Sequence, residues 1–574
     1  MKKLLLVILF LITVSSAFAS TDARFIERDS PLYAEMDALY ALSCLASPNT
    51  NRPWTESQAR LYLSKIDYDS LSDAGKELYK SIEIEIEKGL RWEFDDGFSL
   101  SGGITFSNEI YAHTNSEFDR EEEWVRSWTD REPLIRLWGE VSSGSMFYTA
   151  ADILYRYGRA AMEDDYGLLK DIMTTDGYIG SYDLSDPEKT PYIISSKYFS
   201  EKLATNFFTN TQNFSFIWPR RAVFSFGGER WNVSFSRDRM KLGKSHIGSL
   251  LVDDHSDYTD SIRTTFFNKY FTYDWILLPL NTLTSHSEDP VEESRVYMIH
   301  TLDFRILDKV SLKISENVMW KYSNFDLGYL NPSFFYHNLN NRSMFNALAY
   351  IEVNASLFKG FTLYGQYAMD QARAPHEGDS QSDAWGMSVG GEYTFSLGKS
   401  VFTAYSEYLL TSPLLYRRDG VDFIKVSRYY HQGSDNDTYG HIPFFEYIGY
   451  RYGGDTSTLK TGVTYIYPSM AEAEFSVQLM EHGGMNIYKS HNKEGKNEGN
   501  ANIGGSTPTG DDVLRAIIIS LKGEVDFSSI LAWPGISIYG EADWIGLASF
   551  NKENKEYKDY MSDFQLSLGV SLAI

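Results

Sequence analysis

A single cysteine, Cys44, stands in this sequence of 574 residues. No second thiol is available for an internal disulfide, and Cys44 falls on the apolar face of a predicted helix, which indicates a small core residue. Long apolar runs are also missing. After residue 19 no window approaches the roughly 18 to 20 apolar residues that a membrane-spanning helix requires, so we expect no helical membrane topology.

Basic residues are few as well. The sequence has 53 Lys and Arg against 78 Asp and Glu, a formal net charge of −25 at pH 7. Such a surface repels phosphate-rich partners, so we expect no nucleic acid among them. An acidic polysaccharide would also be repelled unless divalent cations bridged the two surfaces.

The sequence also lacks the motifs of familiar enzymes. We find no serine elbow, zinc-binding helix motif, P-loop or dinucleotide fingerprint in a fitting context, and we therefore expect no enzyme. The 11 histidines are scattered, and His246, His255 and His286 lack the close spacing of a zinc site. We interpret them as surface residues.

Two acidic groups have the side chains that calcium prefers. They are Asp253, Asp254, Asp257 and Asp260, and the run Asp435-Asn436-Asp437. Neither group has the spacing of a defined calcium loop, so we favour solvated turns and expect no cofactor. In the alternative, calcium bridges the first group to an anionic glycan.

The amino terminus has the pattern of a secretory signal peptide. Lys2 and Lys3 precede the apolar run Leu4 to Val14, and Ala17-Phe18-Ala19 follows. This predicts a signal peptide over residues 1–19, too short to span a bilayer comfortably. Its removal takes away two lysines and no acid, which makes the formal charge of the mature chain −27.

Aromatic residues and glycine are plentiful. The chain has 40 Tyr, 35 Phe, 12 Trp and 42 Gly, at a mean hydropathy of −0.33. A transmembrane barrel has this composition because its polar lumen dilutes the apolar face, while girdles and tight turns need aromatic residues and glycine. A secreted β-rich enzyme that binds sugar could share it.

Residues 20–91 are predicted to form a small periplasmic helical domain, because apolar residues recur there at helical spacing. One helix begins at Ser30 and ends at Pro48. A second begins at Thr55, with a glutamine placed to complete a capping box. A third runs from Ser72 to Leu90. Its solvated face is expected to carry Glu83, Glu85 and Glu87.

From Trp92 onward the apolar period changes to two, which predicts that residues 92–574 form an all-β transmembrane barrel. The last strand, Asp563 to Ile574, alternates strictly between apolar and polar or small residues. The closing strand of a barrel needs this pattern, because lipid-facing and lumen-facing side chains alternate. The clearest hairpin joins Ala347–Phe358 to Phe361–Asp370.

At about 25 to 30 residues for each strand and its connection, this segment accommodates about 16 to 18 antiparallel strands. Further strands are expected at 147–157, 222–228, 231–237, 310–320, 385–396, 459–467, 471–481, 513–525 and 536–544. Counting back from Ile574 at the periplasmic rim predicts another wall strand at Asp422 to Tyr430. Extracellular loops are expected at 158–190, 371–384, 411–420 and 483–512.

Acidic and amide side chains share the lumen face of several predicted strands. A glycosidase needs two carboxylates roughly 5 to 10 Å apart. A polar lumen explains the same alternation without catalysis, and we favour that interpretation. The residues concerned are Gln366, Asp370, Glu392, Glu472, Glu474 and Gln478.

Three segments resemble the Wzi-like capsule assembly proteins of the outer membrane. In the first, Trp231 to Leu251, a strand leads through a turn to G-S-L-L. Its matching residues are Gly243, Gly248, Ser249, Leu250 and Leu251, whereas Leu242 and Lys244 replace the family's Trp and Pro. The second is Leu330-Asn331-Pro332 with the later strand that ends at Asp370, and the third is a turn that contains Gly453 and Asp455.

The resemblance implies a periplasmic helical bundle joined to an outer-membrane barrel that assembles or attaches capsular or other extracellular polysaccharide without catalysis. Its implied partners are outer-membrane lipid, surface polysaccharide and the polysaccharide export machinery. The motif residues either set turns, which we favour, or shape a plug and a glycan surface. Two alternatives stay open: a porin-like channel for small polar solutes, and an adhesin that acts through its long loops.

Overall fold

The computed structural model describes residues 22–574 except 89, 91, 95–96, 119–123, 157–159, 162–192, 195–202, 208–214, 216–217, 285–290, 322–330, 332–344, 372–382, 418–420, 433–438, 486, 488–505 and 529–534. Several predictions lie outside the described residues. They concern the signal peptide at 1–19, His286, Pro332, the run Asp435-Asn436-Asp437 and most of the loops at 158–190, 371–384 and 483–512.

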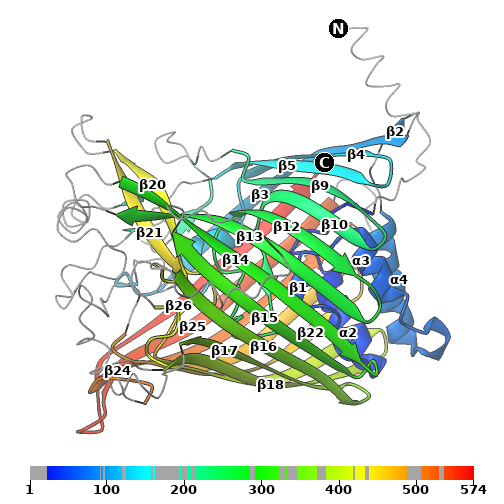
Figure 1. The fold of residues 1–574 in the computed structure, drawn as a ribbon. Helices are drawn as coiled ribbons and strands as arrows, with labels where there is room; N and C mark the ends of the chain where they lie inside the picture. The colour runs from blue at the N-terminus through cyan, green and yellow to red at the C-terminus, as the bar shows by residue number, and fades with distance from the viewer. Residues whose placement is uncertain are drawn as a thin grey trace.

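Long antiparallel strands build the wall of a closed barrel (Figure 1). They are β3 (Phe98–His113), β4 (Ile135–Ser143), β5 (Phe147–Tyr155), β9 (Arg221–Gly228), β10 (Trp231–Asp238), β12 (Thr259–Phe267), β13 (Phe271–Thr284), β14 (Val291–Ile306), β15 (Val310–Lys321), β16 (Phe345–Phe358), β17 (Phe361–Gln371), β18 (Ala384–Leu397), β19 (Ser400–Thr411), β22 (Thr456–Tyr467), β23 (Ala471–His482), β24 (Asp512–Asp526), β25 (Gly535–Asn551) and β26 (Glu556–Ala573).

Eighteen wall strands are present in the described part of the chain, and β26 pairs with β3 to close the circle. Two short strands, β2 (Trp92–Phe94) and β8 (Leu203–Thr205), pair with β3 beside them. The predicted fold class is therefore confirmed, at the upper end of the expected strand number.

The wall is apolar outside and polar inside, as the period of two predicts. On β26, Phe564 and Leu568 are 44% and 51% exposed, while Gln565 and Ser567 are buried in the lumen. Exposed apolar side chains recur on the outer face around the wall, including Phe106, Phe235, Phe266, Ile351, Leu363, Val389, Phe475, Leu521 and Ile538. This is the arrangement that a barrel wall needs in lipid.

Three α-helices of the described chain lie at one end of the barrel, here called the helix end (Figure 1). They are α2 (Leu32–Leu42), α3 (Glu56–Leu63) and α4 (Asp73–Glu87), with a 3-10 turn, η1 (Tyr68–Ser70), before the last. Thr55 and Gln58 form the predicted capping box, and Ser72, where the third helix was predicted to begin, caps α4. The apolar core of the helices includes Val401 and Ile466 from the wall, so the helices pack directly against the barrel.

Within the described residues, no helix is both long and apolar enough to cross a membrane.

The first helix is shorter than predicted. It ends at Leu42 rather than Pro48, and Cys44 lies beyond it with φ 56° and a half-buried side chain. The prediction that Cys44 lies on a helix face is therefore wrong. The chain leaves the helix because its next residues bond to the wall: the Ala46 N–H donates to the Asp308 carbonyl at 2.9 Å, in the turn between β14 and β15.

The wall strand predicted at Asp422 to Tyr430 is also wrong. A strand is present there, β20 (Ile424–Gln432), but it pairs with β21 (Tyr439–Tyr447) in a separate hairpin. The wall passes directly from β19 to β22. β20 and β21 satisfy one another's backbone hydrogen-bonding groups, so neither needs a partner in the wall. Both belong to the long connection between β19 and β22, at the end of the barrel opposite the helices (Figure 1).

Candidate binding cavity behind a lumen plug

The connection between α2 and α3 enters the barrel. Residues 46–54 lie inside the lumen, where β1 (Asn51–Arg52) pairs with β11 (Lys241–Leu242). Three successive side chains bond to the wall: Asn49 to Asp303 at 2.9 Å, Thr50 to Glu352 at 2.6 Å and Asn51 to Asp274 at 2.8 Å. All six are buried, so the segment is held by polar contacts away from water.

The connection between β10 and β12, residues 239–258, also folds inward and contains the first family-like motif. Gly243 has φ 131°, and a Cβ there would lie 2.5 Å from the Ser249 hydroxyl oxygen and 2.7 Å from that of Tyr350. The Leu250 N–H donates to Gln366 Oε1 of β17 at 2.9 Å. Glycine is needed at 243 because no side chain fits between the segment and the wall.

The connection between β19 and β22 covers the same region from the opposite end. Tyr416 donates its hydroxyl to the Leu250 carbonyl at 2.7 Å. At the end of this connection, Asp455 accepts from the backbone N–H groups of Thr509 at 2.8 Å and Met485 at 3.1 Å. An apolar core joins the two connections to the wall, and it includes Leu250, Leu251, Ile276, Ile299, Leu348, Tyr416, Phe423, Tyr447 and Tyr450.

We call residues 46–54, 239–258 and the described parts of 412–425 and 446–455 the lumen plug. The plug contains Gly243, Gly248, Ser249, Leu250, Gly453 and Asp455 of the predicted site residues. Asp370 is buried on β17, while Asn331 is exposed and lies apart from the plug segments in sequence. Gln366 contacts the plug from the wall.

The two described histidines of the predicted surface set are not surface residues. His246 stacks on Tyr405, with ring centroids 3.7 Å apart, and its Nε2 lies 2.6 Å from Glu392. His255 lies 3.3 Å from Asp253. The prediction is wrong for both because the connection that carries them folds into the lumen.

The aspartates that follow the G-S-L-L motif do not form a common site. Lys241 lies 3.6 Å from Asp253 and 3.8 Å from Asp254. Asp254 also pairs with Arg28, Asp257 pairs with Arg220, and Asp260 lies 2.8 Å from Arg237. Asp253 and Asp257 are buried, so solvated turns are the wrong description for them. Across the described ranges, no group of three or more acidic, cysteine or histidine side chains is arranged to hold a metal ion.

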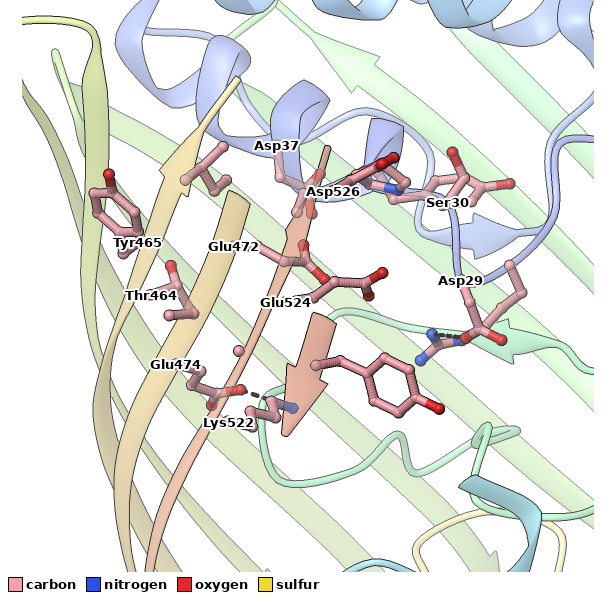
Figure 2. A pocket seen from close by; sticks show the side chains of 18 of the residues that line it. Asp29, Ser30, Asp37, Thr464, Tyr465, Glu472, Glu474, Lys522, Glu524 and Asp526 are labelled. Atoms are coloured by element: carbon pink, nitrogen blue, oxygen red, sulfur yellow. Dashed lines mark hydrogen bonds and ion pairs between the residues drawn. The ribbon is translucent and has the colours of Figure 1, made fainter. Parts of the chain in front are cut away.

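A cavity of about 680 Å³ lies between the plug, α2 and the wall strands β22 to β26 (Figure 2). Glu472 and Glu474 of β23 face it, as do Lys522 and Glu524 of β24. Glu474 lies 2.9 Å from Lys522 and 3.2 Å from Lys460. The sequence analysis placed Glu472, Glu474 and Glu392 in the lumen, and all three line this cavity.

Sequence analysis missed Lys522 and Glu524 as lining residues. Their signal was available, because both lie on a strand that was predicted and alternate with apolar or small neighbours. It also missed the inner segment from Asn49 to Arg52. No periodic pattern marks that segment, and its position depends on wall residues far away in the sequence.

Comparison of the sequence with described protein families and with curated proteins finds no match. Among solved structures, Wzi of Escherichia coli is an outer membrane protein involved in group 1 capsule assembly and a carbohydrate-binding β-barrel. It covers 95% of this chain and 98% of its own, with a TM-score of 0.54 at 11% sequence identity. The chain has the Wzi fold.

Similarity to other solved barrels is weaker. OpdQ of Pseudomonas aeruginosa covers 83% of this chain and 97% of its own, with a TM-score of 0.37 at 8% identity. The channel DcaP of Acinetobacter baumannii covers 84% and 100%, with a TM-score of 0.31 at 8% identity. TM-scores this low do not establish a common fold. The similarity to Wzi confirms the fold that the sequence resemblance implied.

Proposed function

We propose that this chain is a non-catalytic outer-membrane protein for the assembly or surface attachment of capsular or other extracellular polysaccharide. The lumen plug carries the proposal. A porin needs a water-filled lumen, whereas here buried apolar and bonded polar side chains join plug and wall. Arg295 of β14, for example, is fully buried and donates to the carbonyls of Asp422 and Ile424 at 2.8 and 2.7 Å.

The Wzi fold supports a glycan as the ligand, since Wzi is described as a carbohydrate-binding barrel of capsule assembly. In this proposal the signal peptide directs export and the apolar outer face contacts outer-membrane lipid. The helices lie in the periplasm, where the polysaccharide export machinery is accessible. The acidic lumen residues serve binding and not hydrolysis.

Single-channel recording in planar bilayers separates this function from a porin. We expect no stable ohmic conductance from the purified chain, and a steady open pore would contradict the proposal. In cells, deletion of the gene for this protein should release polysaccharide from the surface while total polysaccharide synthesis stays unchanged. Surface glycan that is retained after deletion would overturn the proposed function. The absence of catalysis is tested by the chain length of glycan incubated with the protein, which should stay unchanged.

A further inference from the structure

The cavity behind the plug reaches the rim at the helix end. Asp526 at the end of β24, Gly535 at the start of β25 and Ala573 at the end of β26 line it on that side. On the inner side it is lined by Thr50 and Ser245 of the plug. A ligand would therefore enter from the helix end and meet the plug. Its volume of about 680 Å³ lies within the roughly 300 to 1,000 Å³ usual for sites of small ligands.

Hydroxyl and aromatic side chains line part of the cavity. Thr464 of β22 faces it (Figure 2), and Ser537 and Tyr539 of β25 lie on its other wall. Hydroxyls both donate and accept hydrogen bonds, and tyrosine combines an apolar ring with a polar tip. Such a surface suits a ligand that has both C–H faces and hydroxyl groups.

The bases that line the cavity already have acidic partners. Lys522 lies 2.9 Å from Glu474, Lys244 lies 2.7 Å from Glu392 and Arg52 lies 2.6 Å from Asp37. The other lining bases, Arg28, Lys241 and Arg126, are likewise paired with carboxylates. An anionic ligand would have to compete with carboxylates that are already in place.

Two carboxylates of the cavity, those of Glu472 and Glu524, differ from the ion-paired carboxylates described above. Glu472 and Glu524 are register partners on β23 and β24, and both side chains point into the cavity (Figure 2). In the part of the chain that the structure describes, neither forms an ion pair within 4.0 Å. Like charges directly opposite on neighbouring strands repel each other. A ligand that brings positive charge or hydrogen-bond donors relieves this repulsion.

We propose that the cavity binds a short stretch of a neutral or amine-bearing glycan that enters from the helix end. Glu472 and Glu524 accept hydrogen bonds from its amine or hydroxyl groups, and the hydroxyl and tyrosine side chains contact the rest of the sugar. A uronic acid places a further negative charge beside the two glutamates and is rejected. This inference rests on the proposed function and names the class of polysaccharide that it concerns.

Calorimetry on the full-length chain in detergent tests the site. Three probes are compared: β-1,4-linked diglucosamine, its N,N′-diacetylated form, and digalacturonic acid. We expect the first two to bind and the third not to bind. The double variant Glu472→Gln with Glu524→Gln should weaken the binding of diglucosamine by about tenfold or more, because charge-assisted hydrogen bonds are lost. The diacetylated probe should be affected less.

A steric variant locates the site. Ala34 lies on an exposed part of α2 and lines the cavity, so Ala34→Trp fills the space without disturbing the core of the helices. It should abolish binding of both sugars, while Glu83→Gln on the exposed face of α4 should leave binding unchanged. Binding that persists in the Ala34→Trp chain, equal binding of digalacturonic acid, or no binding by any probe overturns the proposal.

Complementation keeps this inference distinct from the proposed function. If the Ala34→Trp chain restores surface polysaccharide to a deletion strain as fully as the native chain, the cavity site falls and the proposed function stands. If deletion leaves surface polysaccharide unchanged, the proposed function falls, even where the purified chain binds diglucosamine.

Discussion

Asn51 donates its side-chain amide to Asp274 at 2.8 Å, although 223 residues separate the two and both are fully buried. The same amide lies 2.8 Å from the Thr301 hydroxyl, and Lys313 donates to Asn51 Oδ1 at 2.8 Å. One side chain from between two helices is thus bonded to three neighbouring wall strands. The inner segment belongs to the interior of the barrel, and the helices are anchored through it.

Asn51→Ala should destabilise the folded protein by about 1 to 3 kcal/mol, because buried partners lose hydrogen bonds. Thermal unfolding in detergent measures the change. Asn554→Ala is the matched control, since Asn554 is exposed and should alter stability little. Equal melting temperatures for the two variants would show that the inner segment is not held by this contact.

Glu35 should make the stability of the helical domain depend on pH. It is 3% exposed, and burial raises its pKa from 4.5 to about 7, although Ser81 and the Ser469 N–H donate to it. Between pH 4.5 and about 7, the folded state therefore holds a proton that the unfolded state has lost. Stability from this group is complete below pH 4.5 and is lost as pH rises through 7.

The variant Glu35→Gln should remove this dependence, which amounts to at most about 3 kcal/mol between pH 5 and 8. Hydrogen exchange of residues 32–42 at both pH values measures it. The native chain should exchange faster at pH 8, after correction for intrinsic rates, and the variant should not. Glu83→Gln should keep the native dependence, and a native chain with equal protection at both values would refute the assignment.

Two glycines with positive φ separate backbone strain from steric contact. Gly453 has φ 69°, and a Cβ there would lie 2.3 Å from the Tyr447 ring. Gly398 has φ 62° with nothing within 4 Å. Both alanine variants bear a backbone cost of about 1 to 2 kcal/mol, but only Gly453→Ala must also displace Tyr447. We expect a lower melting temperature and faster proteolysis of residues 412–455 in Gly453→Ala than in Gly398→Ala.

Neighbouring positions on β26 test which face meets lipid. Leu568 is 51% exposed on the outer face, whereas Ser567 is buried in the lumen opposite Glu541. Leu568→Lys should impair insertion, at a cost of about 2 to 4 kcal/mol if the residue lies near the bilayer midplane. Ser567→Lys places its charge near a carboxylate and should insert better. Heat-dependent gel mobility of the refolded chains gives the folded fraction. A higher folded fraction for Leu568→Lys than for Ser567→Lys would contradict the assignment of faces.

Local patterns predicted much of the wall. The hairpin of β16 and β17, the alternation of β26 and the capping box at Thr55 each depend on residues close together in sequence. The same patterns misplaced β20, because alternation shows that a strand forms and does not show which strand it pairs with. Cys44 was misplaced because contacts with the wall end its helix early.

The candidate site was predicted only in part. Glu472 and Glu474 were assigned to the lumen from their alternation, and both line the cavity. That Glu472 lies opposite Glu524, and that Lys522 neutralises Glu474, follows from the register between β23 and β24. Register between two strands joined by a long connection is not encoded in either strand alone.

The sequence by itself determined that the chain forms a barrel wall with an apolar outer face and a small helical domain before it, because hydrophobic period and capping are local properties. Tertiary structure alone decided what occupies the lumen. Buried polar groups must find partners, and those of Asn51, Gly243 and Leu250 find theirs on distant strands and connections. That requirement places the plug, and the plug defines the cavity.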